Sequence, residues 1–185
     1  MALTKTPVCD FGKKAEDFKL KSIENKIISL NDVKGEKATL IMFICNHCPY
    51  VKAIIRDLAK DCNELKKDGI NSVAIMSNDT KNYPEDSFDN MIKFAKTNNF
   101  GEINYLIDET QEIARKYGAV CTPDFFGYNK ELKLQYSGRF RELKDLKPVS
   151  GGDSDLKIAM KMISETQAGP KEQIPSMGCN IKWFN

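Results

Sequence analysis

The feature that most constrains the fold of this chain is an apolar run at residues 38–45 that leads into a long amphipathic pattern. Residues 40–44 are apolar without exception, which is typical of a strand buried on both faces of a sheet. From Cys48 to Lys67, apolar side chains recur every three or four residues with basic residues between them, and Gly69 ends the pattern. A buried strand followed by a helix predicts an α/β fold.

Shorter elements of both types follow along the rest of the chain. Strands are predicted at residues 27–30, 70–76 and 105–107, with a β-hairpin formed by residues 123–128 and 132–136. Helices are predicted at residues 86–97, 110–117 and 153–165, and a turn at residues 31–33. This order predicts a mixed central sheet flanked by helices. At 185 residues the chain is expected to form one domain, residues 1–185, with the tail of residues 168–185 packed on the body.

Charge and hydropathy exclude several classes of protein. Lysine and arginine total 28 against 26 aspartate and glutamate residues, and the net charge of +2 lacks the basic excess of a nucleic-acid-binding domain. The longest apolar run is much shorter than the roughly 20 residues that a membrane-spanning helix needs. Because residues 1–7 contain no apolar stretch after Lys5, we expect neither a signal peptide nor an anchor. A cytoplasmic protein without nucleic-acid or membrane partners is therefore expected.

Six cysteines in a chain of this length are too few and too unevenly spaced for a disulfide scaffold, so reactive or buried thiols are expected. Two of them, Cys45 and Cys48, form a Cys-x-x-Cys motif at the junction between the apolar strand and the amphipathic helix. Cysteines with this spacing can close a small disulfide ring. We expect the first, Cys45, to face the unpaired N–H groups at the start of the helix, where the helix dipole favours a thiolate.

The residues within and directly after the motif support the same chemistry. His47, as an imidazolium, would stabilise the reduced, anionic form of the motif and make its disulfide more oxidising. Pro49 fits the first turn of a helix because it lacks only an N–H group that has no partner there. Asn46 completes the loop, and we group it with His47 and Pro49 as a supporting residue.

A zinc site is the alternative interpretation of the motif, since Cys-x-x-Cys is also common among zinc ligands. A structural zinc site would need a second pair of ligands, and the sequence has neither a second Cys-x-x-Cys motif nor a pair of histidines. The single histidine, His47, lies inside the loop, where binding the same ion as both flanking cysteines would be strained. We therefore expect a redox site with no metal and no cofactor.

A second motif, Cys121-Thr122-Pro123, opens the predicted hairpin about seventy-five residues after the first. Together the two motifs resemble the thioredoxin fold, and the sequence is similar to the peroxiredoxin-like (redoxin, AhpC/TSA-like) members of the thioredoxin superfamily. Further stretches that carry this resemblance are residues 12–20, 43–51, 136–140 and 175–183. The resemblance therefore covers nearly the whole chain and implies a thioredoxin-like fold.

The resemblance also implies how the second motif contributes to the site. The peptide bond before Pro123 is expected to be cis. Thr122 is expected to line the site, where its backbone groups would pair with an extended substrate. Cys121 is expected near the Cys-x-x-Cys motif, either as a small buried thiol or as a shuttle for a disulfide.

The sequence departs from the patterns of these relatives at specific positions. Peroxiredoxins carry a Pro-x-x-x-Thr-x-x-Cys loop; with Cys48 at the position of its cysteine, Cys45 replaces the threonine and Ile41 the proline. Two groups that position a peroxide in that family are thus absent from this loop. The strand of residues 38–44 lacks the buried carboxylate that accepts a proton in thioredoxins. Asp124 is the candidate to replace that carboxylate.

We expect a thiol–disulfide oxidoreductase that cycles Cys45 and Cys48 between dithiol and disulfide. In the thioredoxin-like order that we favour, Cys45 attacks the disulfide of a protein or small-molecule substrate, Cys48 resolves the mixed disulfide, and a thiol partner restores the starting state. In the peroxiredoxin-like order, Cys48 attacks a peroxide, as in a weak antioxidant peroxidase, and Cys45 resolves the sulfenic acid. The non-enzymatic alternative is a binding domain that holds a thiophilic metal through Cys45, Cys48 and a third thiol such as Cys121.

Three residues outside the two motifs receive structural interpretations. Cys62 lies on the predicted amphipathic helix and is expected in the core. Cys179 would resolve a sulfenic acid only if the tail folded back onto the motif, and because no sequence pattern places it there, we expect a structural role. Trp183, the single tryptophan, is expected to anchor the tail.

Overall fold

The structure is a computed structural model that describes residues 2–5 and 10–184. Its centre is a seven-stranded mixed sheet with the strand order β3-β2-β6-β5-β4-β8-β9. These strands are β2 (Lys19–Ser22), β3 (Ile27–Ser29), β4 (Ala38–Phe43), β5 (Ile70–Met76), β6 (Asn104–Ile107), β8 (Asp124–Asn129) and β9 (Leu134–Tyr136). Strands β4, β5 and β6 are parallel to one another, whereas β8 is antiparallel to β4. The mixed α/β architecture expected from the sequence is confirmed.

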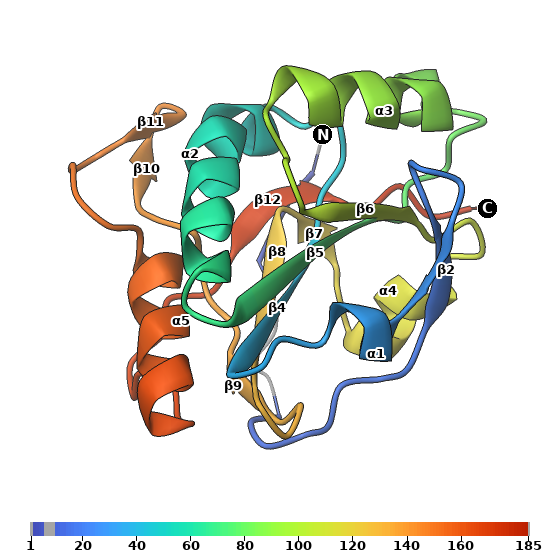
Figure 1. Cartoon of the computed structure of the whole chain (residues 1–185). Coiled ribbons are helices and arrows are strands. Elements are labelled where there is room, and N and C mark those ends of the chain that lie inside the picture. The colour runs from blue at the N-terminus through green and yellow to red at the C-terminus, as the bar shows by residue number, and fades with distance from the viewer. Residues whose placement is uncertain (1, 6–9, 185) are drawn as a thin grey trace.

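Helices cover both faces of this sheet (Figure 1). Helices α2 (Pro49–Lys66), α3 (Phe88–Thr97) and α5 (Asp155–Thr166) contribute to one apolar core, while α1 (Leu30–Val33) and α4 (Glu112–Tyr117) contribute to the other. Side chains along β4 alternate between these cores: Leu40 and Met42 point into the first, Ile41 and Phe43 into the second. Strand β4 is apolar at nearly every position because both of its faces are covered.

The apolar pattern that predicts α2 also explains how the helix packs on the sheet. Its buried side chains, which include Val51, Ile54, Leu58 and Leu65, recur at three- to four-residue spacing along one stripe. This stripe packs on the sheet over β4 and β5, so the start of the helix is fixed at the end of β4. The position of the Cys-x-x-Cys motif is therefore set by packing on both of its sides.

The region of residues 29–33 differs from the prediction of a strand that runs into a turn. Residues 30–33 form one turn of helix, α1, because Ser29 and Asp32 cap each other. The Ser29 side chain accepts a hydrogen bond from the Asp32 backbone N–H, and the Asp32 carboxylate accepts one from the Ser29 backbone N–H. This reciprocal capping box satisfies N–H groups that a helix start otherwise leaves unpaired.

A second, three-stranded sheet joins distant parts of the chain. Strand β12 (Met177–Asn180), from the tail, lies between β1 (Leu3–Lys5) and β7 (Cys121–Thr122), and both pairings are antiparallel. Figure 1 shows β12 beside β7, close to the start of α2. The tail thus reaches the end of the central sheet where β4 ends and the loop to α2 begins.

Two further features complete the described part of the chain. A small hairpin, β10 (Leu143–Lys144) and β11 (Lys147–Pro148), precedes α5, and a short 3-10 helix, η1 (Pro84–Asp86), precedes α3.

Trp183 is partly buried against the second core, and the Arg115 guanidinium lies 4.3 Å from the centre of its ring. None of the helices that the structure describes is both long enough and apolar enough to span a bilayer.

Candidate active site

The Cys-x-x-Cys motif occupies the loop between β4 and α2, and its two cysteines have different positions relative to the helix. The helix begins at Pro49, so Cys48 is the N-cap residue and Cys45 lies three residues earlier. Pro49 occupies the first helical position, as predicted. The expectation that Cys45 faces the start of the helix is wrong: the thiol at the helix N-terminus belongs to Cys48, because the helix starts one residue after it.

The Cys121-Thr122-Pro123 segment lies against both cysteines. The Thr122–Pro123 peptide bond is cis, as the resemblance implies. The Thr122 hydroxyl oxygen lies 3.3 Å from the Cys45 Sγ, and the Cys48 thiol donates a hydrogen bond of 3.2 Å to the Thr122 carbonyl oxygen. Thr122 therefore lines the site with its side chain toward one cysteine and its backbone toward the other.

A third thiol completes this cluster, and it comes from the tail. The Cys179 Sγ lies 2.9 Å from the Cys48 Sγ, and none of Cys45, Cys48 and Cys179 is in a disulfide bond. Residue 179 reaches the site because β12 pairs with β7 in a register that sets Cys179 opposite Thr122. The tail therefore does fold back onto the motif, a position that the sequence left open because the pairing of β12 is a long-range contact with no periodic sequence signal.

The same pairing corrects the expectation for the backbone of Thr122. An extended substrate was expected along this segment, but β12 of the same chain already occupies the edge of β7. Gly178 permits the close approach, since a Cβ atom at this position would lie 2.1 Å from the Thr122 carbonyl oxygen. The edge expected to bind a substrate is therefore filled by the protein's own tail.

The remaining cysteines that were predicted to be buried are buried. Cys121 is fully buried on β7, and its thiol donates a 3.6 Å hydrogen bond to the Pro123 carbonyl oxygen. Cys62 lies in the core beneath α2, where burial raises the pKa of its thiol to about 12. The thiol that touches the motif is Cys179, whereas the sequence suggested Cys121.

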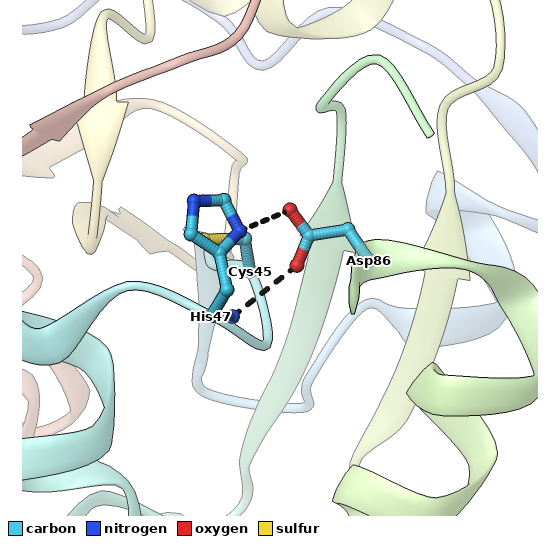
Figure 2. Close-up of side chains that lie close together, drawn as sticks. All are labelled: Cys45, His47 and Asp86. Atoms are coloured by element: carbon cyan, nitrogen blue, oxygen red, sulfur yellow. Dashed lines mark hydrogen bonds and ion pairs between the residues drawn. The ribbon is translucent and has the colours of Figure 1, made fainter. Parts of the chain in front are cut away.

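A buried carboxylate that the sequence reasoning missed holds the loop in place. Asp86, the last residue of η1, is fully buried and accepts hydrogen bonds from the backbone N–H groups of Asn46 at 2.8 Å and His47 at 3.3 Å. Its other oxygen lies 2.7 Å from the His47 Nδ1 (Figure 2) and accepts a 2.8 Å hydrogen bond from the Asn78 side chain. The carboxylate thus fixes both the backbone and the one imidazole of the motif.

Asn46 anchors the same loop from its side chain. Its amide nitrogen donates to the Glu85 carbonyl oxygen at 3.2 Å, and its amide oxygen accepts a 2.9 Å hydrogen bond from the buried Tyr105 hydroxyl. Asn46 is therefore a structural support of the loop that holds Cys45. Neither Asp86 nor Tyr105 was identifiable in advance, because both approach the loop from other elements and have no fixed spacing from the motif.

The surroundings of the two motif cysteines shift their pKa values in opposite directions. The pKa of Cys48 is lowered to about 5 by hydrogen bonds from the thiol of Cys45, then from that of Cys179, and from the Val51 and Cys179 backbone N–H groups, although burial opposes this. The pKa of Cys45 is raised well above its ordinary value by its hydrogen bond to Cys48, by burial and by the negative charge of Asp86. These surroundings favour the thiolate of Cys48 over that of Cys45, whereas the order favoured from the sequence makes Cys45 the attacking thiol.

The surroundings of the His47–Asp86 pair favour the charged form of both side chains. The hydrogen bond to Asp86 raises the pKa of His47 above its ordinary value, and the negative charges of Asp86 and Cys48 add to this effect. The pKa of Asp86 is lowered despite its burial, because His47 and Asn78 donate hydrogen bonds to it. Both shifts favour the charged forms of His47 and Asp86, and the role of His47 in stabilising a thiolate stays a prediction.

One group of side chains in the described ranges 2–5 and 10–184 has the spacing of a metal site. One ligand atom each from Cys45, His47 and Asp86 lie within 4.8 Å of one another, and Figure 2 shows the three side chains together. Both Asp86 oxygens already accept hydrogen bonds, and the His47 Nδ1 is one of their donors. A metal bound there would have to replace these contacts, so the donor set fits a hydrogen-bonded pair better than a metal centre.

Asp124, the candidate proton acceptor, is fully buried at the start of β8. Its carboxylate accepts a 3.3 Å hydrogen bond from the Val120 backbone N–H, and its strand partner on β4 is Phe43, two residues before Cys45. The carboxylate that contacts the Cys-x-x-Cys loop directly is instead Asp86.

A mixed sheet with helices on both faces, a Cys-x-x-Cys motif at the start of a helix and a cis-proline beside it define a thioredoxin-like protein. Solved structures of such proteins agree: the thioredoxin domain of a thiol-disulfide oxidoreductase from Bacteroides vulgatus superposes with a TM-score of 0.59 at 19% identity, covering 70% of this chain and 89% of the other. The AhpC/TSA family matches residues 11–137, and the chain belongs to this family.

Two solved structures match nearly the whole chain. An uncharacterized conserved protein from Geobacillus kaustophilus is 38% identical with a TM-score of 0.94, covering 100% of this chain and 97% of its own. A hypothetical protein from Sinorhizobium meliloti is 36% identical with a TM-score of 0.90, covering 98% of each chain. A search of curated proteins gives no match to this chain. The family resemblance identified in the sequence is thus confirmed, at the level of a redoxin-family thiol protein.

Proposed function

We propose that the protein is a thiol–disulfide oxidoreductase that cycles Cys45 and Cys48 between dithiol and disulfide, with Cys48 as the attacking thiolate. The observation that carries this proposal is that Cys48 is the N-cap of α2 while Thr122 contacts the sulfur atoms of both Cys48 and Cys45. A thiolate at a helix N-terminus is both stabilised and reactive in disulfide exchange. The neighbouring thiol of Cys45 is within reach to resolve the product.

The proposed reaction is two consecutive thiol–disulfide exchanges. The Cys48 thiolate attacks one sulfur of the substrate disulfide; a bond forms between Cys48 and that sulfur, the substrate S–S bond breaks, and the first substrate thiolate leaves. Cys45 then loses its proton and attacks the Cys48 sulfur, which releases the second substrate thiolate and closes the Cys45–Cys48 disulfide. The two electrons that reduce the substrate come from the two cysteines, and an external dithiol returns them.

The surroundings of the thiols favour small disulfides as substrates. The edge of β7 that faces the tail is occupied by β12, so an extended polypeptide cannot pair with that edge while β12 is in place. A cavity of about 450 Å³ is lined by Tyr50 of α2 and Met177 of β12, each two residues from a thiol of the cluster, and by the acidic Asp145. Arg139 and Arg141 also line it. These residues offer apolar and cationic contacts to a small disulfide that carries a negative charge.

Turnover with an external dithiol tests the proposal. The full chain should catalyse reduction of an anionic aromatic disulfide by dithiothreitol, and insulin more slowly. Cys48→Ser should lose this activity, Cys45→Ser should still form a bond between Cys48 and the first substrate sulfur, and Cys62→Ser, a buried thiol of the same helix, should match the wild type. Purified protein that shows no turnover and holds a metal at one equivalent would instead support a non-catalytic metal-binding domain.

A weak thiol peroxidase is the second candidate function, and the low pKa of Cys48 favours it. In that reaction Cys48 attacks the peroxide to give a sulfenic acid and releases an alcohol or water, and Cys45 condenses with the sulfenic acid, which closes the disulfide and releases water. The Thr122 hydroxyl lies next to the cysteines but is in contact with Cys45. Consumption of hydrogen peroxide with dithiothreitol as donor, measured beside disulfide reduction, ranks the two activities.

A further inference from the structure

We infer that Cys179 is a third redox-active thiol of this site, so that Cys48 exchanges a single disulfide bond between Cys45 and Cys179. This inference rests on the proposed function, in which Cys48 is the attacking thiol. The Cys179 Sγ lies 2.9 Å from the Cys48 Sγ, whereas bonded sulfur atoms are about 2.05 Å apart. Closing a Cys48–Cys179 disulfide therefore requires a displacement of about 1 Å.

The tail is built to hold Cys179 at this position. Strand β12 is paired on both sides, with β1 and with β7, and Gly178 allows its backbone to approach the Thr122 carbonyl oxygen. Beyond the strand, the Ile181 backbone N–H donates to the Val120 carbonyl oxygen at 3.0 Å, and the Lys182 carbonyl oxygen accepts from the Asp79 N–H at 2.8 Å. The thiol is thus fixed by backbone contacts before, at and after residue 179.

The charges near the two resolving thiols favour Cys179 once Cys48 has reacted. Burial, the hydrogen bond with Cys48 and the charge of Cys48 raise the pKa of Cys179 to about 12 in the reduced protein. In a mixed disulfide, Cys48 carries neither that charge nor the thiolate that accepts the hydrogen bond. Cys179 then remains near the Lys182 cation, which lowers its pKa, whereas Cys45 remains near the Asp86 anion, which raises its pKa.

Each exchange step balances without any additional oxidant. In the mixed disulfide, the sulfur of Cys48 is bonded to a substrate sulfur. Cys179 loses its proton to solvent and attacks the Cys48 sulfur; the Cys48–Cys179 bond forms and the substrate thiolate leaves. Cys45 attacks the Cys48 sulfur in turn, forming the Cys45–Cys48 bond and releasing the Cys179 thiolate, with no net oxidation. Both disulfides contain Cys48, so the site holds one of them at a time.

Stoichiometric oxidation of the full chain tests this inference. An anionic aromatic disulfide is added to the reduced protein, the released aromatic thiolate is measured by absorbance, and the bonds are mapped by mass spectrometry of non-reduced peptides. Cys45→Ser should release a second thiolate and contain a Cys48–Cys179 disulfide. Cys179→Ser should release a second thiolate and contain a Cys45–Cys48 disulfide. The double variant should stop at the mixed disulfide, and Cys62→Ser, which removes a buried thiol outside the cluster, should behave as the wild type.

The outcomes separate this inference from the proposed function. If Cys45→Ser stops at the mixed disulfide while Cys179→Ser closes Cys45–Cys48, the third thiol is refuted and the oxidoreductase stands. If the wild type forms no bond at Cys48, the proposed function fails as well. A test on the wild type does not depend on whether a variant folds. When the wild type is quenched with acid during oxidation, both disulfides should be found. The Cys45–Cys48 disulfide alone at every time point would overturn the inference.

Discussion

Cys45 and Cys48 belong to one motif and hydrogen-bond to each other, but they lie in two regions with opposite electrostatic character. Around Cys45, the loop is tied to the buried Asp86 carboxylate, whose charge opposes ionisation. Around Cys48, the start of α2 and the thiol of Cys179 on β12 provide hydrogen-bond donors to a thiolate. The spacing of the motif thus determines which bond can form, while the elements packed around it determine which sulfur is charged.

The largest expected effect concerns which thiol reacts first. At mildly acidic pH, iodoacetamide should label Cys48 before Cys45, because the thiolate fraction falls about tenfold for each unit by which the pKa exceeds the pH. Cys48→Ser should slow labelling of the motif at least about tenfold, whereas Cys45→Ser should leave the fast phase in place. Peptide mapping after a short pulse identifies the site. Faster labelling of Cys45 would reverse the comparison and restore the order expected from the sequence.

Removing the charge of Asp86 should make the surroundings of Cys45 electrostatically more similar to those of Cys48. In Asp86→Asn, the pKa of Cys45 should fall because a nearby negative charge is lost, and the pKa of His47 should fall toward about 6.5. We also expect a loss of about 1–3 kcal/mol in the free energy of unfolding, since buried hydrogen-bond donors lose an ionic acceptor. NMR titration of His47 and urea unfolding measure both effects. Glu85→Gln, which neutralises the exposed neighbour, is the matched control.

The pH dependence of the free energy of unfolding should also report on the His47–Asp86 pair, with a smaller effect. The folded state raises the pKa of His47, so its contribution is full below the ordinary value of about 6.5 and is lost as the pH rises through the folded pKa. The folded state lowers the pKa of Asp86, so its contribution is present above about 3.9 and is lost as the pH falls through the folded value. The pair therefore stabilises the protein most at mildly acidic pH.

Urea unfolding of the wild type and of His47→Gln over a series of pH values tests this expectation. The difference in unfolding free energy should be largest between the two ordinary pKa values and should shrink as the pH rises from the ordinary pKa of His47 through its folded pKa. A difference that stays constant across this range would show that the imidazole stabilises the loop by packing, for example on the Tyr83 ring, with which it is stacked at 5.7 Å.

Local patterns predicted the framework of the site, and long-range contacts supplied the rest. The apolar run of β4, the stripe of α2 and Pro49 between them are local signals, so the junction and its motif could be located from the sequence. Asp86 and Cys179 reach the motif only after η1 and β12 have packed against it. A carboxylate in a loop and a cysteine in a tail have no periodicity that distinguishes them from solvent-exposed residues.

The same distinction explains which assignment within the motif was wrong. Sequence spacing placed a helix start close to Cys48 but could not decide which cysteine is the N-cap, since element boundaries are uncertain by a few residues. The first helical residue is Pro49, so Cys48 is the N-cap, and the Val51 backbone N–H favours its thiolate. Family resemblance correctly implied the cis bond before Pro123, but the partner of β7 is set by the tail, which the resemblance left without a role.

The smallest expected effect tests the contact between Thr122 and Cys45. The hydroxyl oxygen lies 3.3 Å from the sulfur, and a hydroxyl that donates to the sulfur lowers the pKa of Cys45. Thr122→Val keeps the shape of the side chain and removes the hydroxyl, so the pKa of Cys45 should rise by less than about one unit, given about 1 kcal/mol for such a hydrogen bond. Thr122→Ser keeps the hydroxyl and should leave the pKa unchanged.

Alkylation of Cys45 as a function of pH, measured in Cys48→Ser with and without the Thr122 substitutions, reports the direction of this hydrogen bond. If the hydroxyl donates, Thr122→Val slows labelling of Cys45 and widens the difference between the two regions. If the hydroxyl accepts the thiol proton instead, it stabilises the neutral form, and its removal speeds labelling. Faster labelling would therefore show that Thr122 acts together with Asp86 to keep Cys45 protonated until Cys48 has reacted.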